Sequence, residues 1–193
     1  ANDSHLVADS ILIQKHSNLH TAKELEPLVG TYYDSLSISI RDVQVDNNKL
    51  IIYKELVPVD HYHFKVPNSI VHYCFEKTEE KDYILIRKSG DSEEVYLKID
   101  QNANTEKDLS EYKGKYKNKF CDRGLKIKIK NNELYLSLFG GLSKLKFRQI
   151  QNDFFHNSQN SFAIEFIRNS NNEIVGFNWQ TQRTWDILFQ KES

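Results

Sequence analysis

Methionine is absent from this chain of 193 residues, and cysteine, proline and glycine are scarce, with two, three and seven copies respectively. The two cysteines, Cys74 and Cys121, are too few for the disulfide framework that stabilises many small secreted domains. Long apolar runs are missing as well, because no segment approaches the roughly 20 apolar residues that a transmembrane helix needs. We therefore expect no membrane span and a fold that depends on a hydrophobic core.

A strong charge of one sign is also missing, because 26 Lys and Arg residues face 27 Asp and Glu residues, a net charge of −1. A nearly neutral chain has no long-range attraction to nucleic acid, so we expect no nucleic-acid partner. The halves differ, however: residues 1–104 carry 11 basic against 17 acidic residues, and residues 105–193 carry 15 against 10. Either oppositely charged units help each other to dock, or two solvated surfaces have diverged after a duplication.

What the sequence does contain is an internal repeat. Thr21–Leu25 returns as Thr105–Leu109, an offset of 84 residues, with Thr, Lys, an acid and Leu at the same spacing. Three further pairs keep this offset without a gap: Gly30–Tyr32 with Gly114–Tyr116, Val43–Val45 with Ile127–Ile129, and Asn47–Leu50 with Asn131–Leu134. The chain is therefore interpreted as a tandem duplication.

The repeat also predicts where the two copies differ in length. Asn68–His72 matches Asn152–His156 at the offset of 84, which also makes His72 and His156 equivalent. The last strands match at 90 instead, as from Val95 to Trp185. We therefore expect the second repeat to have gained six residues near 157–161.

Each repeat begins with the pattern of a short helix. Thr21 and Glu24 are typical of a capping box, and Thr105 with Asp108 approximates the same arrangement. Gly30 and its counterpart in the second repeat follow where a left-handed residue would end the helix. A further helix is predicted over Ser4–Gln14, before the first repeat.

Alternation with a period of two follows each short helix and indicates β-strands. In the second repeat Leu125, Ile127 and Ile129 alternate with lysines, which places the apolar side chains on one face. Asn131-Asn132 then favours a tight hairpin turn, since Asn tolerates a positive φ. Seven or eight such strands in each repeat must curl or pack on another layer to bury their apolar face.

The sequence thus predicts an all-β fold with a minor α component. The expected architecture is two tandem antiparallel β-barrel or half-barrel repeats, each preceded by a short helix. The boundaries follow from the repeat: an N-terminal helix and linker at residues 1–20, the first repeat at 21–100 and the second at 105–193.

The order Leu109-x-x-Tyr-x-Gly-x-Tyr116, an alternating strand, the Asn-Asn hairpin, a Phe-rich strand and Gly176-Phe-x-Trp179 extends to Lys191. It resembles the lipocalin-like β domain of unknown function found C-terminal to serine hydrolases of the β-lactamase and penicillin-binding-protein type. Leu25–Ile99 is similar to a more divergent copy. The resemblance implies a preceding serine hydrolase domain as partner, with the helix Ser4–Gln14 at its junction, and a periplasmic or secreted location rather than a cytoplasmic one.

Hydrolases of that type use Ser-x-x-Lys together with Tyr-x-Asn. The chain contains Ser110-x-x-Lys113, Ser143-x-x-Lys146 and Tyr116-x-Asn118. The first belongs to the helix that opens the second repeat, the second lies in a strand, and Tyr116 is only six residues from Ser110. We interpret these matches as accidental, assign no catalytic residue or cofactor, and expect the chain not to be an enzyme.

The remaining candidates are binding residues. His61 and His63 are two apart in a predicted strand and would share a face, which makes them half of a metal site with His72 as a neighbour, although solvated histidines explain them better. Lys113–Lys119 and Lys126–Lys130 favour a charged outer face that blocks pairing at a sheet edge, with an anion-binding face as the alternative. The candidate ligand-binding residues are Tyr32, Tyr116, Trp179 and Trp185, although aromatic side chains also fill small barrels.

Two functions follow as hypotheses. The first is a non-catalytic accessory module that packs on or regulates a serine hydrolase domain. The second is a lipocalin-like binder of a small apolar or peptide-like ligand. Bulky residues at nearly every inward position of the second repeat favour the first, because they leave a small barrel without room for a ligand.

Overall fold

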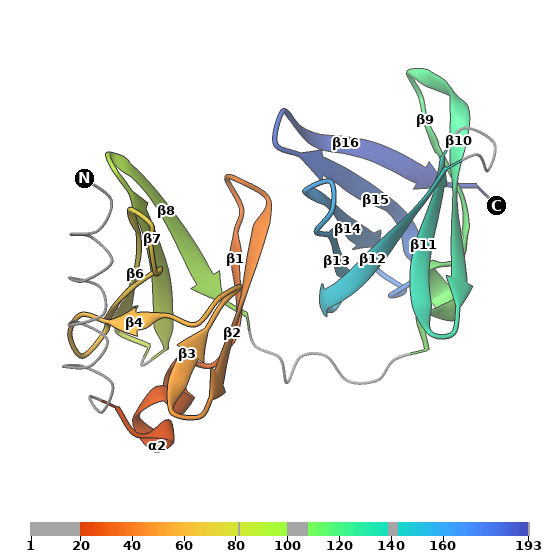
Figure 1. Cartoon of the computed structure of the whole chain (residues 1–193). Helices are drawn as coiled ribbons and strands as arrows, with labels where there is room; N and C mark the ends of the chain where they lie inside the picture. Colours follow the sequence, from red (N-terminus) through yellow and green to blue (C-terminus); the bar gives the residue numbers. More distant parts are fainter. Residues whose placement is uncertain (1–19, 81, 100–107, 139–142, 193) are drawn as a thin grey trace. The chain divides into compact units, whose positions relative to one another are not determined.

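A computed structural model describes residues 20–80, 82–99, 108–138 and 143–192, without the side chains of residues 121–123, 143 and 184–186 (Figure 1). The described chain divides into two compact units that largely follow the two repeats, and each unit has a hydrophobic core of its own. The predicted helix Ser4–Gln14, the linker at residues 100–104 and the capping residue Thr105 lie outside the described residues.

The first unit consists of a helical turn and eight strands. Its elements are α2 (Ala22–Leu25), η1 (Glu26–Leu28), β1 (Gly30–Asp34), β2 (Ser39–Asp46), β3 (Lys49–Ile51), β4 (Val57–Pro58), β5 (His63–Lys65), β6 (Val71–Lys77), β7 (Tyr83–Ser89) and β8 (Ser92–Lys98). The second unit repeats this order with η3 (Leu109–Tyr112), β9 (Gly114–Asn118), β10 (Cys121–Lys130), β11 (Glu133–Leu138), β12 (Ser143–Gln151), β13 (Phe154–Asn157), β14 (Phe162–Arg168), β15 (Ile174–Thr181) and β16 (Thr184–Lys191).

The strands of both units form an antiparallel up-and-down meander. In the second unit β16 pairs with β9 and closes an eight-stranded barrel. In the first unit β8 pairs with β1 in the same way, but the eight-stranded sheet has β3 and β4 as its two ends. The predicted all-β fold of two barrel-like repeats is confirmed, with one barrel closed and the other nearly closed.

Local signals at the start of each unit explain the short helices. In the first unit the Glu24 carboxylate accepts a hydrogen bond from the Thr21 backbone N–H at 2.7 Å, as the capping box predicts. In the second unit Asp108 is itself the residue that caps η3, because its carboxylate accepts from the Ser110 N–H at 2.9 Å. Asp108 therefore takes the capping role that the sequence pattern assigned to Thr105.

The interior of the second unit is filled by large side chains. Tyr116, Phe155 and Phe177 are fully buried, and their rings pack against Phe166 or one another with centroids 4.9 to 6.1 Å apart. Of the residues predicted to share one face, Ile127 is buried in this core and Leu125 and Ile129 are partly buried against it. Leu134, Leu136 and Phe166 are also buried there, and Phe162 is partly buried. Each fully buried aliphatic or aromatic side chain contributes about 1.5–3 kcal/mol relative to its exposed state.

Two tyrosines and two lysines hold the same positions in both units. The Tyr32 hydroxyl donates to the Leu28 carbonyl at 2.9 Å, and the Tyr116 hydroxyl donates to the Tyr112 carbonyl at 2.7 Å. Lys98 Nζ donates to the Pro27 carbonyl, and Lys191 Nζ donates to the Glu111 carbonyl, so the last strand of each unit satisfies the end of its helix.

These lysines also explain the two repeated glycines. A Cβ on Gly30 would lie 2.8 Å from Lys98 Cε, and one on Gly114 would lie 3.0 Å from Lys191 Cε. Gly30 has a φ of 152°, whereas Gly114 is not among the residues with positive φ, and both begin a strand. The predicted positive-φ cap is therefore wrong for Gly114, whereas Gly30 does have a positive φ directly after the C-cap residue Val29. At both positions a glycine also leaves room for the lysine side chain.

The strand order corrects the predicted length difference between the repeats. Asn68–His72 leads into β6, whereas Asn152–His156 leads into and occupies β13, so these segments are not equivalent. Phe64 faces Tyr73 across β5 and β6, just as Phe155 faces Ile164 across β13 and β14. The offset therefore grows from 84 at Leu50 and Leu134 to 91 at Phe64 and Phe155, before the predicted insertion point. It is 93 at Lys98 and Lys191, which face Tyr32 and Tyr116, so the predicted match of Val95 with Trp185 is wrong as well.

Seven of the extra residues of the second unit, 91 − 84, belong to the β11–β12 hairpin, and the length of this hairpin distinguishes the closed barrel from the nearly closed one. β11 and β12 pair over five residue positions, from Leu134–Phe147 to Leu138–Ser143. At the same place in the first unit, a hydrogen bond from Leu56 N–H to the Leu50 carbonyl and a single bridge between Ile51 and Glu55 join β3 to β4. The short hairpin leaves β3 and β4 as the ends of the sheet.

Candidate functional site

The two candidate tyrosines are core residues in the structure. Tyr32 and Tyr116 are fully buried, and both hydroxyls donate to backbone carbonyls. Burial raises the pKa of both phenols well above the ordinary value, so both remain protonated donors. Their hydroxyls serve the junction between the helix and the first strand of each unit.

The candidate tryptophans lie on the last two strands of the second unit. Trp179, on β15, packs on Phe162 and Phe189 with ring centroids 5.2 and 6.3 Å apart, and it is partly buried against the core. Trp185 belongs to β16, and its side chain lies outside the described part of the structure. The described contacts of Trp179 are those of a core residue.

The histidines of the first unit form two separate pairs. His61 precedes β5, and its ring stacks on His20 with centroids 5.3 Å apart. His63 lies on β5, and its Nε2 is 2.8 Å from Nδ1 of His72 on β6. The expectation that His61 and His63 share one face of a strand is therefore wrong, because β5 begins only at His63.

The geometry of the His63–His72 pair is that of a hydrogen bond. Two imidazole nitrogens bound to one tetrahedral zinc ion at about 2.0–2.1 Å would be about 3.3 Å apart, longer than the observed 2.8 Å. The Asp60 carboxylate approaches His63 Nδ1 at 3.7 Å. Among the described residues no group of three His, Cys, Asp or Glu side chains is arranged to hold a metal ion.

The residues of the three hydrolase-like motifs have other positions and contacts in the structure. The Ser110 hydroxyl donates to the Asp108 carboxylate at 2.6 Å, so it takes part in capping η3. Ser143 is the first residue of β12, and the Lys146 ammonium of the same motif pairs with Glu133 on β11. Tyr116 of the third motif is buried in the core.

An apolar cavity of about 50 Å³ lies in the first unit, where β3 and β4 separate. Leu25, Leu50, Leu56 and Phe64 line it, and an ion pair between Lys49 and Glu55 at 2.7 Å stands at its rim. Pockets for small-molecule ligands usually enclose about 300–1,000 Å³. This cavity suits a group of a few heavy atoms and is too small for a whole lipocalin-type ligand.

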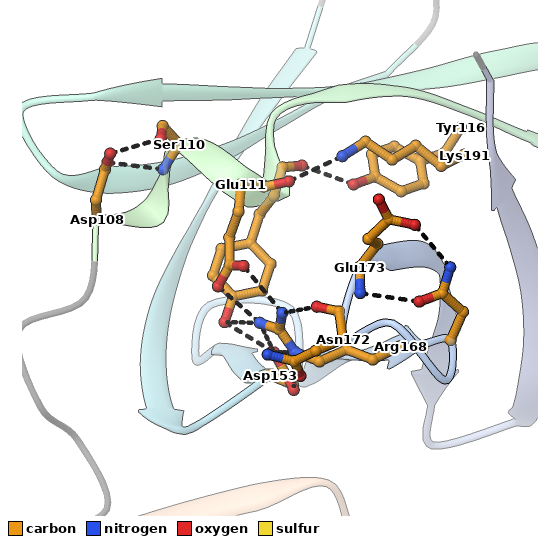
Figure 2. A network of polar contacts seen from close by, with 11 residues as sticks. Asp108, Ser110, Glu111, Tyr116, Asp153, Arg168, Asn172, Glu173 and Lys191 are labelled. Carbon is orange, nitrogen blue, oxygen red and sulfur yellow. Dashed lines mark hydrogen bonds and ion pairs between the residues drawn. The ribbon is translucent and has the colours of Figure 1, made fainter.

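A polar network that the sequence interpretation missed lies at the helical end of the second barrel (Figure 2). The Arg168 guanidinium donates to the Asp153 carboxylate at 2.8 and 2.9 Å and to the Glu111 carboxylate at 2.6 and 2.9 Å. It also donates to the Asn172 carbonyl at 2.8 Å, and the Tyr112 hydroxyl donates to Asp153.

The network fastens η3 to the β12–β13 turn and to the end of β14. The hydrogen bonds that Arg168 donates to Glu111, and then those to Asp153, raise the pKa of Arg168. Burial, and then the hydrogen bond to Asp153, raise the pKa of Tyr112. Its donors and acceptors are engaged with one another, which is typical of a structural clamp. The internal repeat did not predict this network, because the first unit has Pro27 and Leu28 where the second has Glu111 and Tyr112.

Two outer surfaces remain as candidates for binding. On the first unit, Tyr33, Ile84, Val95 and Leu97 lie on neighbouring strands β1, β8 and β7, and we call them the apolar patch. On the second unit, exposed lysines lie along the outer face of strands β9, β10 and β12. Both surfaces face outward on strands whose alternate residues form the cores.

The fold and these surfaces define a tandem β-barrel protein with packed interiors. Residues 98–191 match the family model of a domain of unknown function (DUF3471), so the second repeat is similar to that family. No curated protein matches the chain. Among the residues that the structure describes, no helix is long and apolar enough to cross a membrane.

Proposed function

We propose that this chain is a non-catalytic accessory module that binds a partner protein domain through its outer surface. The observation that carries the proposal is the apolar patch of the first unit. Leu97 is 63% exposed and Val95 43% exposed, and the register places Leu97 between Tyr33 and Ile84 on the adjacent strands. Tyr33 and Ile84 beside them are half-buried, and contiguous apolar side chains at a surface are typical of protein interaction sites.

Comparison of the two units supports a binding role for the patch. At the same place in the second unit the outward pairs are Gly176 with Gln190 and Asn178 with Leu188. Leu188 is the one large apolar side chain of these two pairs, and it is 42% exposed. Because the second barrel folds without a continuous apolar face there, the fold itself does not require one.

The resemblance to a β domain that follows serine hydrolases supports a hydrolase domain of the β-lactamase type as the partner. The filled interior of the second unit and the small cavity of the first leave little room for a ligand. They therefore support binding of a partner through the outer surface more than the function of a lipocalin-like carrier. Neither unit needs catalytic residues of its own for this role.

The experiment uses the full chain and a purified β-lactamase-type hydrolase domain from the same genome. We expect a complex in isothermal titration calorimetry, and at least a tenfold weaker one for the double variant Val95→Thr/Leu97→Thr. Leu188→Thr is the matched control, since it removes an apolar side chain of similar exposure from the other unit. Absence of a complex, or equal weakening by the control, would overturn the proposal.

The same purified chain tests the carrier function. A small ligand held at about 100 times its dissociation constant stabilises its protein by about 2.7 kcal/mol. We expect no such stabilisation in a thermal-shift screen of small apolar and peptide-like compounds. A reproducible ligand-dependent rise that is abolished by Leu56→Phe, which would fill the cavity of the first unit, would favour the carrier instead.

A further inference from the structure

Seven exposed lysines gather on the outer face of three strands of the second barrel. They are Lys115 and Lys117 on β9, Lys126, Lys128 and Lys130 on β10, and Lys144 and Lys146 on β12, and we call them the lysine face. β11 lies between β10 and β12 and presents Glu133, whose carboxylate accepts from Lys146 and Tyr135. The face therefore carries a large excess of positive charge.

Stability of the barrel does not account for this excess. Lys126 lies directly opposite Lys115 in the register of β9 and β10, and like charges at such a position are destabilising. At the offset of 84 the first unit has Thr31 and Asp42 in place of Lys115 and Lys126. A barrel of the same strand order therefore forms without lysines at these positions.

Protection of a sheet edge does not account for it either. Charged residues on edge strands prevent pairing with other chains, and this was the interpretation that the sequence favoured. In the structure β9, β10 and β12 each have a hydrogen-bonded neighbour on both sides, because the second barrel is closed. That interpretation is wrong for these strands, since a closed barrel has no edge.

Three residues of the lysine face also line an open hollow. The register of β9 and β10 shifts between Cys121 and Leu125, and beside this shift an open hollow of about 280 Å³ is lined by Lys115, Lys117 and Lys126. Gly124, Leu125 and the Glu192 carboxylate complete its lining. Lysine ammonium groups are compact charges that bind phosphate groups without a fixed geometry.

We propose that the lysine face binds a flexible, phosphate-bearing polyanion that runs along the strands. Alternate lysines on one strand are about 6.7 Å apart, and the rows on β10 and β12 are about 10 Å apart. Consecutive phosphates of a polyphosphate chain share a bridging oxygen and lie closer together than this, so one flexible chain can contact successive lysines with every second or third phosphate.

The curvature of the barrel favours a flexible chain over a flat membrane surface. In a barrel of eight strands the outward direction turns by roughly 45° from each strand to the next, so the rows on β9 and β12 face directions far apart. A planar surface meets only part of the face, whereas a flexible chain follows it. Among the described outward residues of β9 to β12 the aromatic side chain is Tyr135, and its hydroxyl donates to Glu133. One ring does not form the series of aromatic side chains on which the bases of a single-stranded nucleic acid stack.

The test measures binding of labelled long-chain inorganic polyphosphate to the full chain by fluorescence anisotropy, from about 50 to about 200 mM NaCl. We expect the affinity to fall steeply with salt, because each phosphate contact releases counterions. Lys126→Gln/Lys128→Gln should weaken binding and reduce the slope of log affinity against log salt by about 1.4, with about 0.7 for each lost contact to a single-stranded polyanion.

The matched control is Lys54→Gln/Lys77→Gln, which removes the same charge from exposed lysines of the first unit and should leave the slope unchanged. Lys115→Gln should weaken binding while it raises thermal stability, since it relieves the repulsion with Lys126. Opposite changes of affinity and stability cannot result from partial unfolding.

Four outcomes would overturn the proposal, and the first three are no binding of polyphosphate at low salt, the same change of slope in the control, and tighter binding of a single-stranded oligonucleotide than of polyphosphate. Binding to phosphatidylglycerol vesicles without binding to polyphosphate would do so as well, and would identify a membrane surface instead. The proposal does not depend on the apolar patch, so it stands or falls separately from the accessory function.

Discussion

Replacement of Arg168 by methionine is expected to destabilise the second unit strongly. The Arg168 side chain is only 17% exposed, and it makes five hydrogen bonds to the carboxylates of Asp153 and Glu111. Methionine would fill part of the same volume but would leave both carboxylates without their cation. Lys191, the other cation drawn in Figure 2, donates to the backbone carbonyl of Glu111.

The magnitude follows from the burial of the three side chains. Breaking a fully buried ion pair by removing one partner costs about 3–5 kcal/mol. Asp153 is 24% and Glu111 37% exposed, so water recovers part of this loss. We therefore expect a loss of about 2–3 kcal/mol, which for a unit of this size corresponds to a fall of roughly 10–20 °C in Tm.

Tryptophan fluorescence provides a selective assay. Both tryptophans of the chain, Trp179 and Trp185, lie on strands of the second unit, so their emission reports unfolding of that unit and not of the first. Arg183→Met is the matched control, because it removes an arginine that is exposed on the same unit. Its free energy of unfolding should stay within about 0.5 kcal/mol of that of the unsubstituted chain.

Two further variants separate the charge from the geometry of the clamp. Arg168→Lys keeps the charge but cannot reach both carboxylates with paired donors, so its loss should lie between those of the parent chain and Arg168→Met. Arg168→Met/Asp153→Asn should recover part of the loss, because it removes one of the stranded carboxylates. An Arg168→Met midpoint no lower than that of Arg183→Met would refute the clamp.

The remaining predictions concern the packing, the pH response and the chemistry of the chain. Gly176→Ala should cost about 1–3 kcal/mol in the fluorescence assay, because its Cβ would lie 2.5 Å from the Phe189 carbonyl oxygen, and Gly124→Ala, at 3.3 Å from Tyr116 O, should cost less. Burial, then His63 and Lys65, lower the pKa of His72 below its ordinary value of 6.5, with Lys88 opposite it on β7. As the pH falls, the unfolded state therefore binds the proton first. The contribution of His72 to the free energy of unfolding is complete above about pH 6.5 and is lost as the pH drops through the pKa of His72 in the folded state. Circular dichroism during urea unfolding should show a smaller loss of stability at low pH for His72→Gln. Finally, the chain should not hydrolyse β-lactam or ester substrates above background, and activity that disappears with Ser110→Ala or Ser143→Ala would contradict the non-catalytic function.

The repeat and the strand alternation could be predicted from the sequence because they depend on local patterns. A side-chain period of two places Leu125, Ile127 and Ile129 toward one side whatever the strand pairs with. The capping box at Thr21 and Glu24 was predictable for the same reason, since its hydrogen bonds join residues three apart. Close packing of bulky inward side chains also follows from residue volumes in a barrel of this size.

Closure of the barrels depended on contacts between residues distant in sequence. Whether β3 meets β4, or β11 meets β12, depends on hairpin length and register, and a single repeat offset cannot express a change from 84 to 91 within one hairpin. The two histidine pairs and the Arg168 clamp arise in the same way, since Arg168 and Glu111 are 57 residues apart. Closure of the second barrel in turn determined the role of its lysine-rich strands. In an open sheet the same lysines would protect an edge, whereas in a closed barrel they form a charged outer face.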